Sequence, residues 1–219
     1  MYSGIVLTHS YNAAVTDSAS SATAYSTGFK TNNGVLGLDK DLNVLENLTE
    51  TIDKFGFVSS LISTSEVTHA TPAAFASHVD LRWKTDIISS QMIDSKVATI
   101  LGGGRYFFIP EEEGGKREDG INLLNEINQS HILLTQKNDL SNISGSLNKQ
   151  VLGLFADEHL RDEDKKDNHK LEPSLAEMLE YSVSRSNLLI DQGCAGFFVM
   201  AEGSQVDWAG HSNDFDLSL

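Results

Sequence analysis

Short apolar runs that alternate with helical patterns constrain the fold of this 219-residue chain more than any other feature. Continuous apolar runs of about four to eight residues are typical of strands buried on both faces, as in parallel sheets. The sequence predicts five such strands, at 56–62, 97–101, 131–135, 151–155 and 196–201. The pattern indicates an α/β fold in which helices flank a central, mostly parallel sheet.

Three helices have recognisable start or stop signals. We predict them at Ser18–Thr27, which precedes Gly28, at Pro72–Val79 and at Ser174–Leu189. Thr71 is expected to cap the second helix, with Pro72 at its first position, and Ser174 with Glu177 forms a capping box at the third. The charged segments 116–119 and 157–170 are predicted to be surface loops. No linker divides the chain, so we expect a single domain over residues 1–219.

The charge balance limits the partners of the chain. Sixteen Lys and Arg face thirty-one Asp and Glu, giving a net charge of −15 and a pI near 4.7. This argues against nucleic acid or an anionic membrane as a general partner, but leaves room for an anionic substrate held locally by metals. The apolar run 194–201 is far shorter than the roughly 20 residues that span a bilayer. No Lys or Arg precedes Lys30, so we expect no signal peptide in this chain, and the single Cys194 is expected to be a buried thiol.

Small residues fill the segment 15–28, which contains the first candidate site. A helix that begins near Ser18 packs closely against a sheet while its free N–H groups face outward and attract an anion. The helix dipole contributes only about 0.3–1 kcal/mol, so it orients a serine nucleophile without deprotonating it, and a metal has to do that. The alternative is that Asp17 or Ser18 is only an N-cap.

Thr71 and Arg82, eleven residues apart, form the second candidate site. A capping Thr71 could turn its hydroxyl toward a hard cation. Arg82 offers the planar fork that grips two phosphate oxygens, an interaction of about 1.5–3 kcal/mol. The alternative is a capping threonine and a surface arginine with no further role.

Three residues near the last predicted strand form the third candidate site. Glu202 follows this strand at the carboxyl edge of the sheet, where open α/β sheets bind ligands. Asp207 and His211 are four residues apart, so on a helical turn both point the same way and could share one zinc ion. The oxygen ligand Glu202 suits magnesium better. A pair spaced like Asp207 and His211 also arises by chance.

Together and in this order, these segments resemble the alkaline phosphatase family over about residues 10–214. The similar motifs are Asp-Ser-Ala at 17–19, Ala-Thr-Pro-Ala at 70–73, Leu-Gly-Gly-Gly at 101–104, Leu-Gly-Leu-Phe-Ala at 152–156 and Glu-Gly-Ser at 202–204. The resemblance implies a three-layer sandwich and the hydrolysis of small phosphate monoesters to inorganic phosphate. It also implies a periplasmic or extracellular homodimer.

The resemblance also implies a role for each candidate residue. Ser18 would be phosphorylated and then hydrolysed, Arg82 would hold the phosphoryl oxygens, and Asp17 would orient Arg82. Two zinc ions would flank the phosphoryl group, as suits in-line displacement. The implied metal ligands are Asp207 and His211 for the first zinc, Ser18 for the second, and Glu202 and Thr71 for magnesium.

Two positions depart from the best-known enteric bacterial pattern of the family. His69 and Trp208 stand where that pattern has Asp and Lys, and the combination is similar to that of marine and cold-adapted bacterial members. Loss of a carboxylate and of a cation leads us to expect weaker magnesium binding and faster phosphate release. The alternative is that both side chains only fill space.

Several ligands of the family pattern have no counterpart in this sequence. An early Asp, a later Asp-His pair and a final His are missing, so we expect an internal fragment, incomplete at both ends, with little or no activity alone. A related phosphodiesterase, sulfatase or phosphonate hydrolase is one alternative, although the Arg82 segment fits a monoester dianion better. A non-catalytic zinc- or phosphate-binding protein is another.

Overall fold

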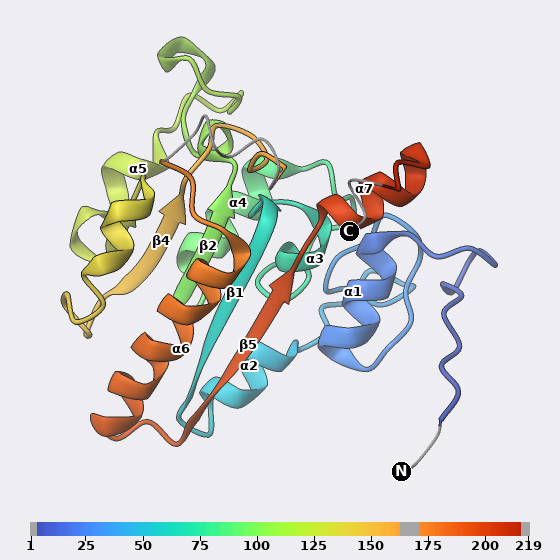
Figure 1. Cartoon of the computed structure of the whole chain (residues 1–219). Coiled ribbons are helices and arrows are strands. Elements are labelled where there is room, and N and C mark those ends of the chain that lie inside the picture. The colour runs from blue at the N-terminus through green and yellow to red at the C-terminus, as the bar shows by residue number, and fades with distance from the viewer. Residues whose placement is uncertain (1–3, 163–170, 216–219) are drawn as a thin grey trace.

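Five parallel strands form one sheet in the computed structural model, which describes residues 4–162 and 171–215 (Figure 1). The strand order is β3-β4-β2-β1-β5, and every neighbouring pair is parallel. All the carboxyl ends therefore lie at one edge of the sheet, as the sequence predicts. The strands are β1 Phe57–Glu66, β2 Thr99–Gly103, β3 His131–Leu134, β4 Gln150–Leu154 and β5 Gly196–Glu202.

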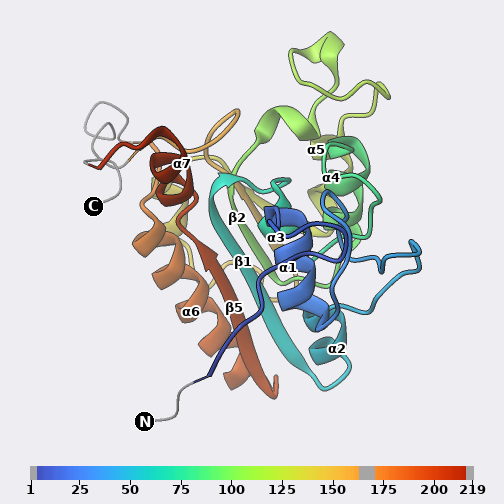
Figure 2. The same ribbon diagram turned by 90° about the vertical axis from the view of Figure 1, so that its right-hand side faces the viewer.

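Helices cover both faces of this sheet (Figure 2). The long helix α6 lies on one face, whereas α1, α3 and α4 lie on the other. The seven α-helices of the described residues are α1 Ser18–Thr27, α2 Leu48–Asp53, α3 Ala70–Ala73, α4 Thr85–Asp94, α5 Leu123–Glu126, α6 Leu175–Asp191 and α7 Gln205–Ser212.

Two apolar clusters, one on each face, show that the sheet is the middle of three layers. Leu61 packs into the cluster that contains the small residues of α1 and α3, whereas the next residue, Ile62, packs into the cluster that contains Met178 and Tyr181 of α6. Ile100 and Leu101 divide between the clusters in the same way. Successive side chains of a strand point to opposite faces, so strands covered on both sides read as continuous apolar runs. The predicted α/β class is confirmed.

The predicted strands all occur, most bounds are within two residues of the prediction, and two differences are larger. β1 continues four residues beyond its predicted end, through Ser63 to Glu66, because partners from distant segments bond its polar side chains. The Ser63 hydroxyl contacts those of Ser65 (2.7 Å) and Ser204 (3.0 Å). β5 is only half-buried, since it lies at the end of the sheet and pairs with β1 alone.

The helix predictions are mixed. α1 has the predicted bounds, and the capping box of Ser174 and Glu177 begins α6. The predicted helix Pro72–Val79 is wrong: α3 ends at Ala73, and His69, not Thr71, stands at its N-cap position without a side-chain bond. The chain leaves the helix because Val79 exchanges two backbone hydrogen bonds with Leu36, both 2.9 Å. That bridge requires extended backbone.

The segment 116–119 is not simply a surface loop. The Arg117 side chain is completely buried and donates to the Ser89 hydroxyl (2.6 Å) and the Asp119 carboxylate (2.5 Å). Of the predicted loop 157–170, residues 157–162 lie outside helices and strands, and 163–170 lie outside the described residues. The Cys194 thiol is half-buried, not buried as expected. Within the described ranges, no helix is long and apolar enough to cross a membrane.

Candidate functional site

Asp17 is the residue that caps α1, and Ser18 is the first residue of the helix. One oxygen of the Asp17 carboxylate accepts hydrogen bonds from the amide and the hydroxyl of Ser20, both at 2.9 Å. The other oxygen accepts from the Gly34 amide (3.0 Å) and from Arg82 (3.3 Å). Asp17 is therefore the N-cap residue, as one alternative proposed. The Ser18 hydroxyl does not cap the helix.

The small side chains of α1 let this helix approach α3 closely. Ala19 and Ala22 are buried, and the buried Ser26 hydroxyl donates to the Ala74 carbonyl at the end of α3 (2.8 Å). Larger side chains at these positions would separate the two helices. The sequence pattern 15–28 thus brings Ser18 near Thr71, on the neighbouring α3.

The Asp17 carboxylate is held in its ionised form. Burial alone would raise its pKa, but the hydrogen bonds from Ser20 and Gly34 and the charge of Arg82 outweigh that effect, so the pKa lies below the ordinary value. At neutral pH Asp17 is therefore a fixed negative charge beside Arg82.

Arg82 is a partly buried residue of this site and not a surface arginine. Its side chain is only 11% exposed, and one end of the guanidinium donates to Asp17 while the other donates to Nε2 of His69 (3.2 Å). The guanidinium also lies over the ring of Trp83, 4.9 Å from its centroid. These contacts fix the plane of the fork.

His69 is neutral in this environment. Burial, followed by the charge of Arg82, lowers the pKa of His69 to about 4. Arginine has only donors, so Nε2 accepts and Nδ1 carries the proton. Nδ1 is buried and bonds to none of the described residues. The ring lies edge-on to those of Trp208 and His159, with centroids 6.1 and 5.9 Å away.

Glu202 ends β5 directly beside Ser63 of β1, with which it is in register. Its Oε2 accepts from the hydroxyls of Ser204 (2.8 Å) and Ser63 (3.0 Å). Because both hydroxyls use the same oxygen, the other oxygen is available to a ligand. The parallel sheet thus places this carboxylate at the expected edge.

One cavity of about 250 Å³ collects most of the candidate residues. Ser18, Thr71, Glu202 and Asp207 line it together with His69 and Trp208. Neither Arg82 nor Asp17 is among the lining residues, but Arg82 contacts the lining residue His69, and Asp17 directly precedes the lining residue Ser18. The wall of this cavity is completed by Ser21, Ala22, Tyr25 and Ser204.

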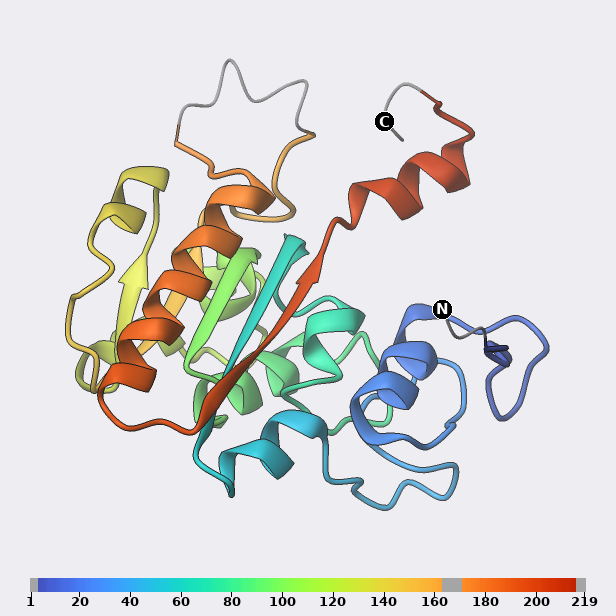
Figure 3. The same cartoon turned by 60° about the horizontal axis from the view of Figure 1, so that its bottom comes forward.

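α7 follows the carboxyl end of β5 (Figure 3). Asp207 and His211 are four residues apart on this helix, so they lie on the same side of it. His211 Nε2 lies 3.6 Å from Asp207 Oδ2, consistent with a spacing of one helical turn. Both side chains are exposed, by 66% and 81%, and His211 does not line the cavity. The structure therefore brings Asp207 and His211 together, but only Asp207 lines the cavity.

The donor atoms fit divalent cations in kind but not in number. Carboxylates of Glu202 and Asp207 and the Thr71 hydroxyl are hard oxygen ligands of the type magnesium prefers. An aspartate and a histidine one turn apart suit zinc. However, the part of the chain that the structure describes contains no cluster of three or more His, Cys, Asp or Glu placed to hold a metal.

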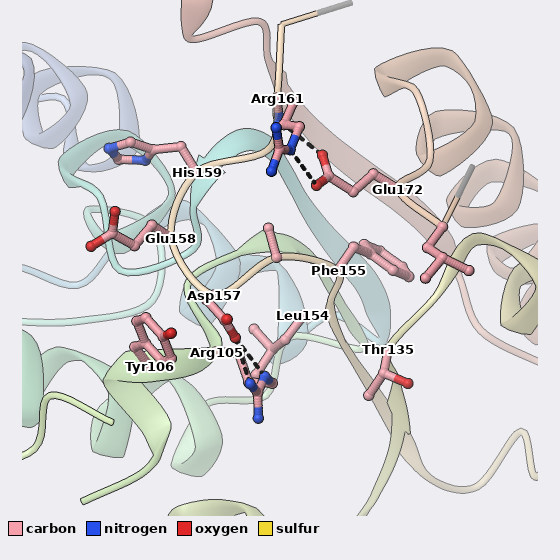
Figure 4. A pocket seen from close by; sticks show the side chains of 12 residues that line it. Arg105, Tyr106, Thr135, Leu154, Phe155, Asp157, Glu158, His159, Arg161 and Glu172 are labelled. Carbon is pink, nitrogen blue, oxygen red and sulfur yellow. Dashed lines mark hydrogen bonds and ion pairs between the residues drawn. The ribbon is translucent and has the colours of Figure 1, made fainter. Parts of the chain in front are cut away.

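A larger cavity of about 500 Å³ lies near the candidate site, beyond His159 (Figure 4). Its guanidinium groups are paired, Arg105 with Asp157 (2.6 Å) and Arg161 with Glu172 (3.8 Å). His159 lines this cavity, while its ring contacts Trp208, with the centroids 4.5 Å apart. The smaller cavity holds the candidate residues, so size does not identify the site here.

Sequence reasoning missed several residues around the smaller cavity. His159 packs against Trp208, and Ser63 and Ser204 bond to Glu202. The hydroxyl-rich segment 63–65 at the end of an apolar run was a usable signal, because buried hydroxyls there need partners. His159 lies in a charged loop and carried no signal of its own.

Comparisons with known proteins agree on one family. The sequence model of the family described as alkaline phosphatase matches residues 1–219. Alkaline phosphatase 4 of Bacillus subtilis is 37% identical over 222 residues, covering 96% of this chain and 44% of the relative. The repressible alkaline phosphatase of Saccharomyces cerevisiae is 34% identical over 226 residues, covering 94% of this chain and 40% of the relative.

Solved structures show the same relationship. The alkaline phosphatase of the Antarctic bacterium TAB5 superposes with a TM-score of 0.83 and 29% identity, over 98% of this chain and 59% of that one. The Thermus thermophilus enzyme superposes with a TM-score of 0.86 and 30% identity, over 98% of this chain and 44% of that one. The chain thus spans about half the length of the relatives it matches, and it belongs to the alkaline phosphatase family.

Proposed function

We propose that this chain carries the phosphoryl-accepting part of an alkaline phosphatase that hydrolyses phosphate monoesters, with Ser18 as the nucleophile. One observation carries the proposal. Ser18 shares a cavity with Thr71, Glu202 and Asp207, while Asp17, directly before Ser18, holds the guanidinium of Arg82. An acceptor hydroxyl, oxygen ligands and an anion-binding cation are the parts that phosphoryl transfer requires.

The proposed reaction has two displacements at phosphorus. In the first, a bond forms between Ser18 Oγ and phosphorus while the bond from phosphorus to the alcohol oxygen breaks. The serine proton is lost, and the alcohol leaves with a proton. In the second, a water oxygen bonds to phosphorus, the bond to Ser18 Oγ breaks, and inorganic phosphate and the free serine result.

The contribution of Arg82 is to bind and orient the phosphoryl group. Asp17 and His69 hold its guanidinium from two sides, so its direction is set before substrate arrives. The neutral His69 adds no competing positive charge to the cavity. The N-terminal amides of α1 add a smaller attraction for the phosphoryl oxygens.

We assign the metal-binding roles of Glu202, Thr71, Asp207 and His211 by donor chemistry and that of Ser18 by family membership. Glu202 and Thr71 would hold magnesium, Asp207 and His211 a first zinc ion, and Ser18 a second. When bound, such cations neutralise phosphoryl charge and lower the pKa of coordinated hydroxyl groups. A structure of a TAB5 variant with a histidine-to-aspartate change is described with Mg bound in the M3 site, which supports a magnesium role in the family.

The candidate set supplies two ligands each for magnesium and the first zinc ion, and only Ser18 for the second zinc ion. We therefore expect weak metal binding by residues 1–219 alone, and slow turnover. Residues 1–219 would form part of one catalytic domain. We further propose a periplasmic or extracellular location and a homodimer, on family membership.

A first-turnover experiment tests the substrate class. Chain 1–219 with zinc and magnesium is mixed with p-nitrophenyl phosphate, bis-p-nitrophenyl phosphate or p-nitrophenyl sulfate, and nitrophenol release is followed. We expect a burst with the monoester only, absent in Ser18→Ala. A larger burst with the diester or the sulfate would favour a related phosphodiesterase or sulfatase. Reversible phosphate binding without any burst would favour a non-catalytic binding protein.

A further inference from the structure

The Asn33–Gly34 turn contacts the start of α1, although it lies sixteen residues after Asp17 in the chain. Asn33 Oδ1 accepts from the Asp17 amide (3.2 Å) and lies within hydrogen-bond distance of the Ser20 hydroxyl oxygen (2.9 Å), and Nδ2 donates to the Val15 carbonyl (3.0 Å). One side chain therefore ties down the backbone before and at the cap of the helix that begins with Ser18.

The chemistry of these contacts requires an amide. The Asp17 N–H is always a donor and the Val15 carbonyl always an acceptor, which fixes the orientation of the Asn33 side chain. A carboxylate has no proton for the Val15 carbonyl and would add a second negative charge near Asp17. Alanine at position 33 would remove the side-chain contacts with the Asp17 amide, the Ser20 hydroxyl and the Val15 carbonyl.

The next residue extends the same contact to Arg82. The Gly34 amide donates to Asp17 Oδ2 (3.0 Å), and the Gly34 carbonyl accepts from the Arg82 amide (2.7 Å). Gly34 has a φ of +86°, which favours glycine. The backbone N–H of Asn33 donates a hydrogen bond to Asn12 Oδ1 (3.0 Å). The turn thus contacts both Asp17 and the Arg82 backbone.

Asn33 is exposed, so its replacement leaves no cavity in the apolar core. Its side chain nevertheless bonds to the backbone of Asp17, the residue whose carboxylate accepts from Arg82. The consequence of losing them is expected to be local misplacement more than global unfolding.

We propose that Asn33 is a positioning residue, which acts through Asp17 and Gly34 to hold Arg82 in its phosphate-binding orientation. This inference rests on the proposed role of Arg82 at the Ser18 site.

A double-mutant cycle tests the inference. Inorganic phosphate is titrated into chain 1–219 with zinc and magnesium, followed by ³¹P NMR, for wild type, Asn33→Ala, Asn33→Asp, Arg82→Ala and Asn33→Ala/Arg82→Ala. We expect Asn33→Ala to weaken phosphate binding about five- to tenfold and Asn33→Asp at least as much. The double variant should bind no more weakly than Arg82→Ala, because Asn33 acts through Arg82.

The matched control is Asn32→Ala, whose side chain donates to the Lys40 carbonyl (3.3 Å). It should leave phosphate binding unchanged, and its melting temperature should match that of Asn33→Ala. Unchanged phosphate binding in Asn33→Ala, or losses that simply add in the double variant, would overturn the inference.

Amide hydrogen exchange separates this inference from the proposed function. If wild type shows no phosphate binding that depends on Arg82, the proposed function fails. Exchange at the Gly34 and Arg82 amides then decides the positioning role. Faster exchange in Asn33→Ala but not in Asn32→Ala would support it, and equal exchange in the two variants would contradict it.

Discussion

The Arg82 guanidinium donates to the Asp17 carboxylate across 3.3 Å, joining the loop after α3 to the residue that caps α1. A lysine at position 82 keeps the charge but lacks the planar fork whose two separate nitrogens donate to Asp17 and His69. We predict that Arg82→Lys weakens inorganic phosphate binding about tenfold. Arg105→Lys is the control, because Arg105 pairs with Asp157 in the larger cavity and should have no effect. If Arg82→Lys binds phosphate as tightly as Arg105→Lys does, the positive charge at position 82 is sufficient and the planar guanidinium is not required.

His69 leaves the cavity without a carboxylate at this position, so we predict that His69→Asp increases magnesium affinity. The new carboxylate would accept hydrogen bonds from water around the ion, and we expect about tenfold tighter binding. Isothermal titration with Mg²⁺ measures this. His9→Asp adds the same charge at an exposed position and serves as the control. Magnesium affinity that is unchanged, or raised equally by both variants, would argue against a magnesium site beside His69.

Trp208 lines the cavity without offering a cation to phosphate. Trp208→Lys should therefore tighten phosphate binding several-fold, since a nearby positive charge stabilises the bound dianion. Phosphate inhibition, or ³¹P NMR titration where turnover is slow, measures the effect. Phe55→Lys, at an exposed residue, controls for the added charge. If phosphate does not bind more tightly to Trp208→Lys, the role assigned to Trp208 is wrong.

Glu66 ends β1 with a side chain that is only 15% exposed. Burial raises the pKa of Glu66 to about 7, from an ordinary value of 4.5, so the folded protein binds this proton more tightly than the unfolded chain does. The stabilising contribution is therefore complete below about pH 4.5 and is lost as the pH rises toward and through 7. The shift corresponds to about 3 kcal/mol of folding free energy.

Glu66→Gln stays neutral and should remove this pH dependence. The free energy of unfolding in urea, measured from pH 5 to 8, should fall less steeply in the variant than in wild type. Glu112→Gln, at an exposed position, should follow wild type. Parallel curves for Glu66→Gln and wild type would mean that Glu66 is not protonated in the folded protein.

Arg117 is buried with its guanidinium bonded to Ser89, Asp119 and the Asp86 carbonyl (3.1 Å). Arg117→Met leaves these partners unpaired and should lower the free energy of unfolding by about 2–4 kcal/mol. Arg105→Met breaks an exposed ion pair and should cost at most about 1 kcal/mol. Denaturant unfolding compares them, and equal losses would contradict the burial of Arg117.

The sheet could be predicted because each strand is a continuous apolar run, and such runs report burial on both faces. The polar end of β1 could not be predicted, because the Ser63 hydroxyl forms its hydrogen bond with Ser204, which is far away in the sequence. The length of α3 was mispredicted for a similar reason: local signals favour a helix to Val79, but the bridge to Leu36 outweighs them. Arg117 looked like a surface residue because its partners on α4 are not apparent from local sequence.

The candidate site was predictable where short motifs carry the residues. Ser18, Thr71 and Glu202 each belong to such a motif, and the structure places all three on one cavity. Asn33 and His159 could not be found in this way, because each lies in a loop and contacts the site only through the fold.

The role of Ser18 as nucleophile can be tested by peptide mass spectrometry of chain 1–219, quenched in acid after incubation with a phosphate monoester, zinc and magnesium. We expect one phosphate on Ser18, absent from Ser18→Ala and reduced in Arg82→Ala. Phosphate on another residue, or none at all while phosphate is released from the substrate, would contradict Ser18 as the nucleophile.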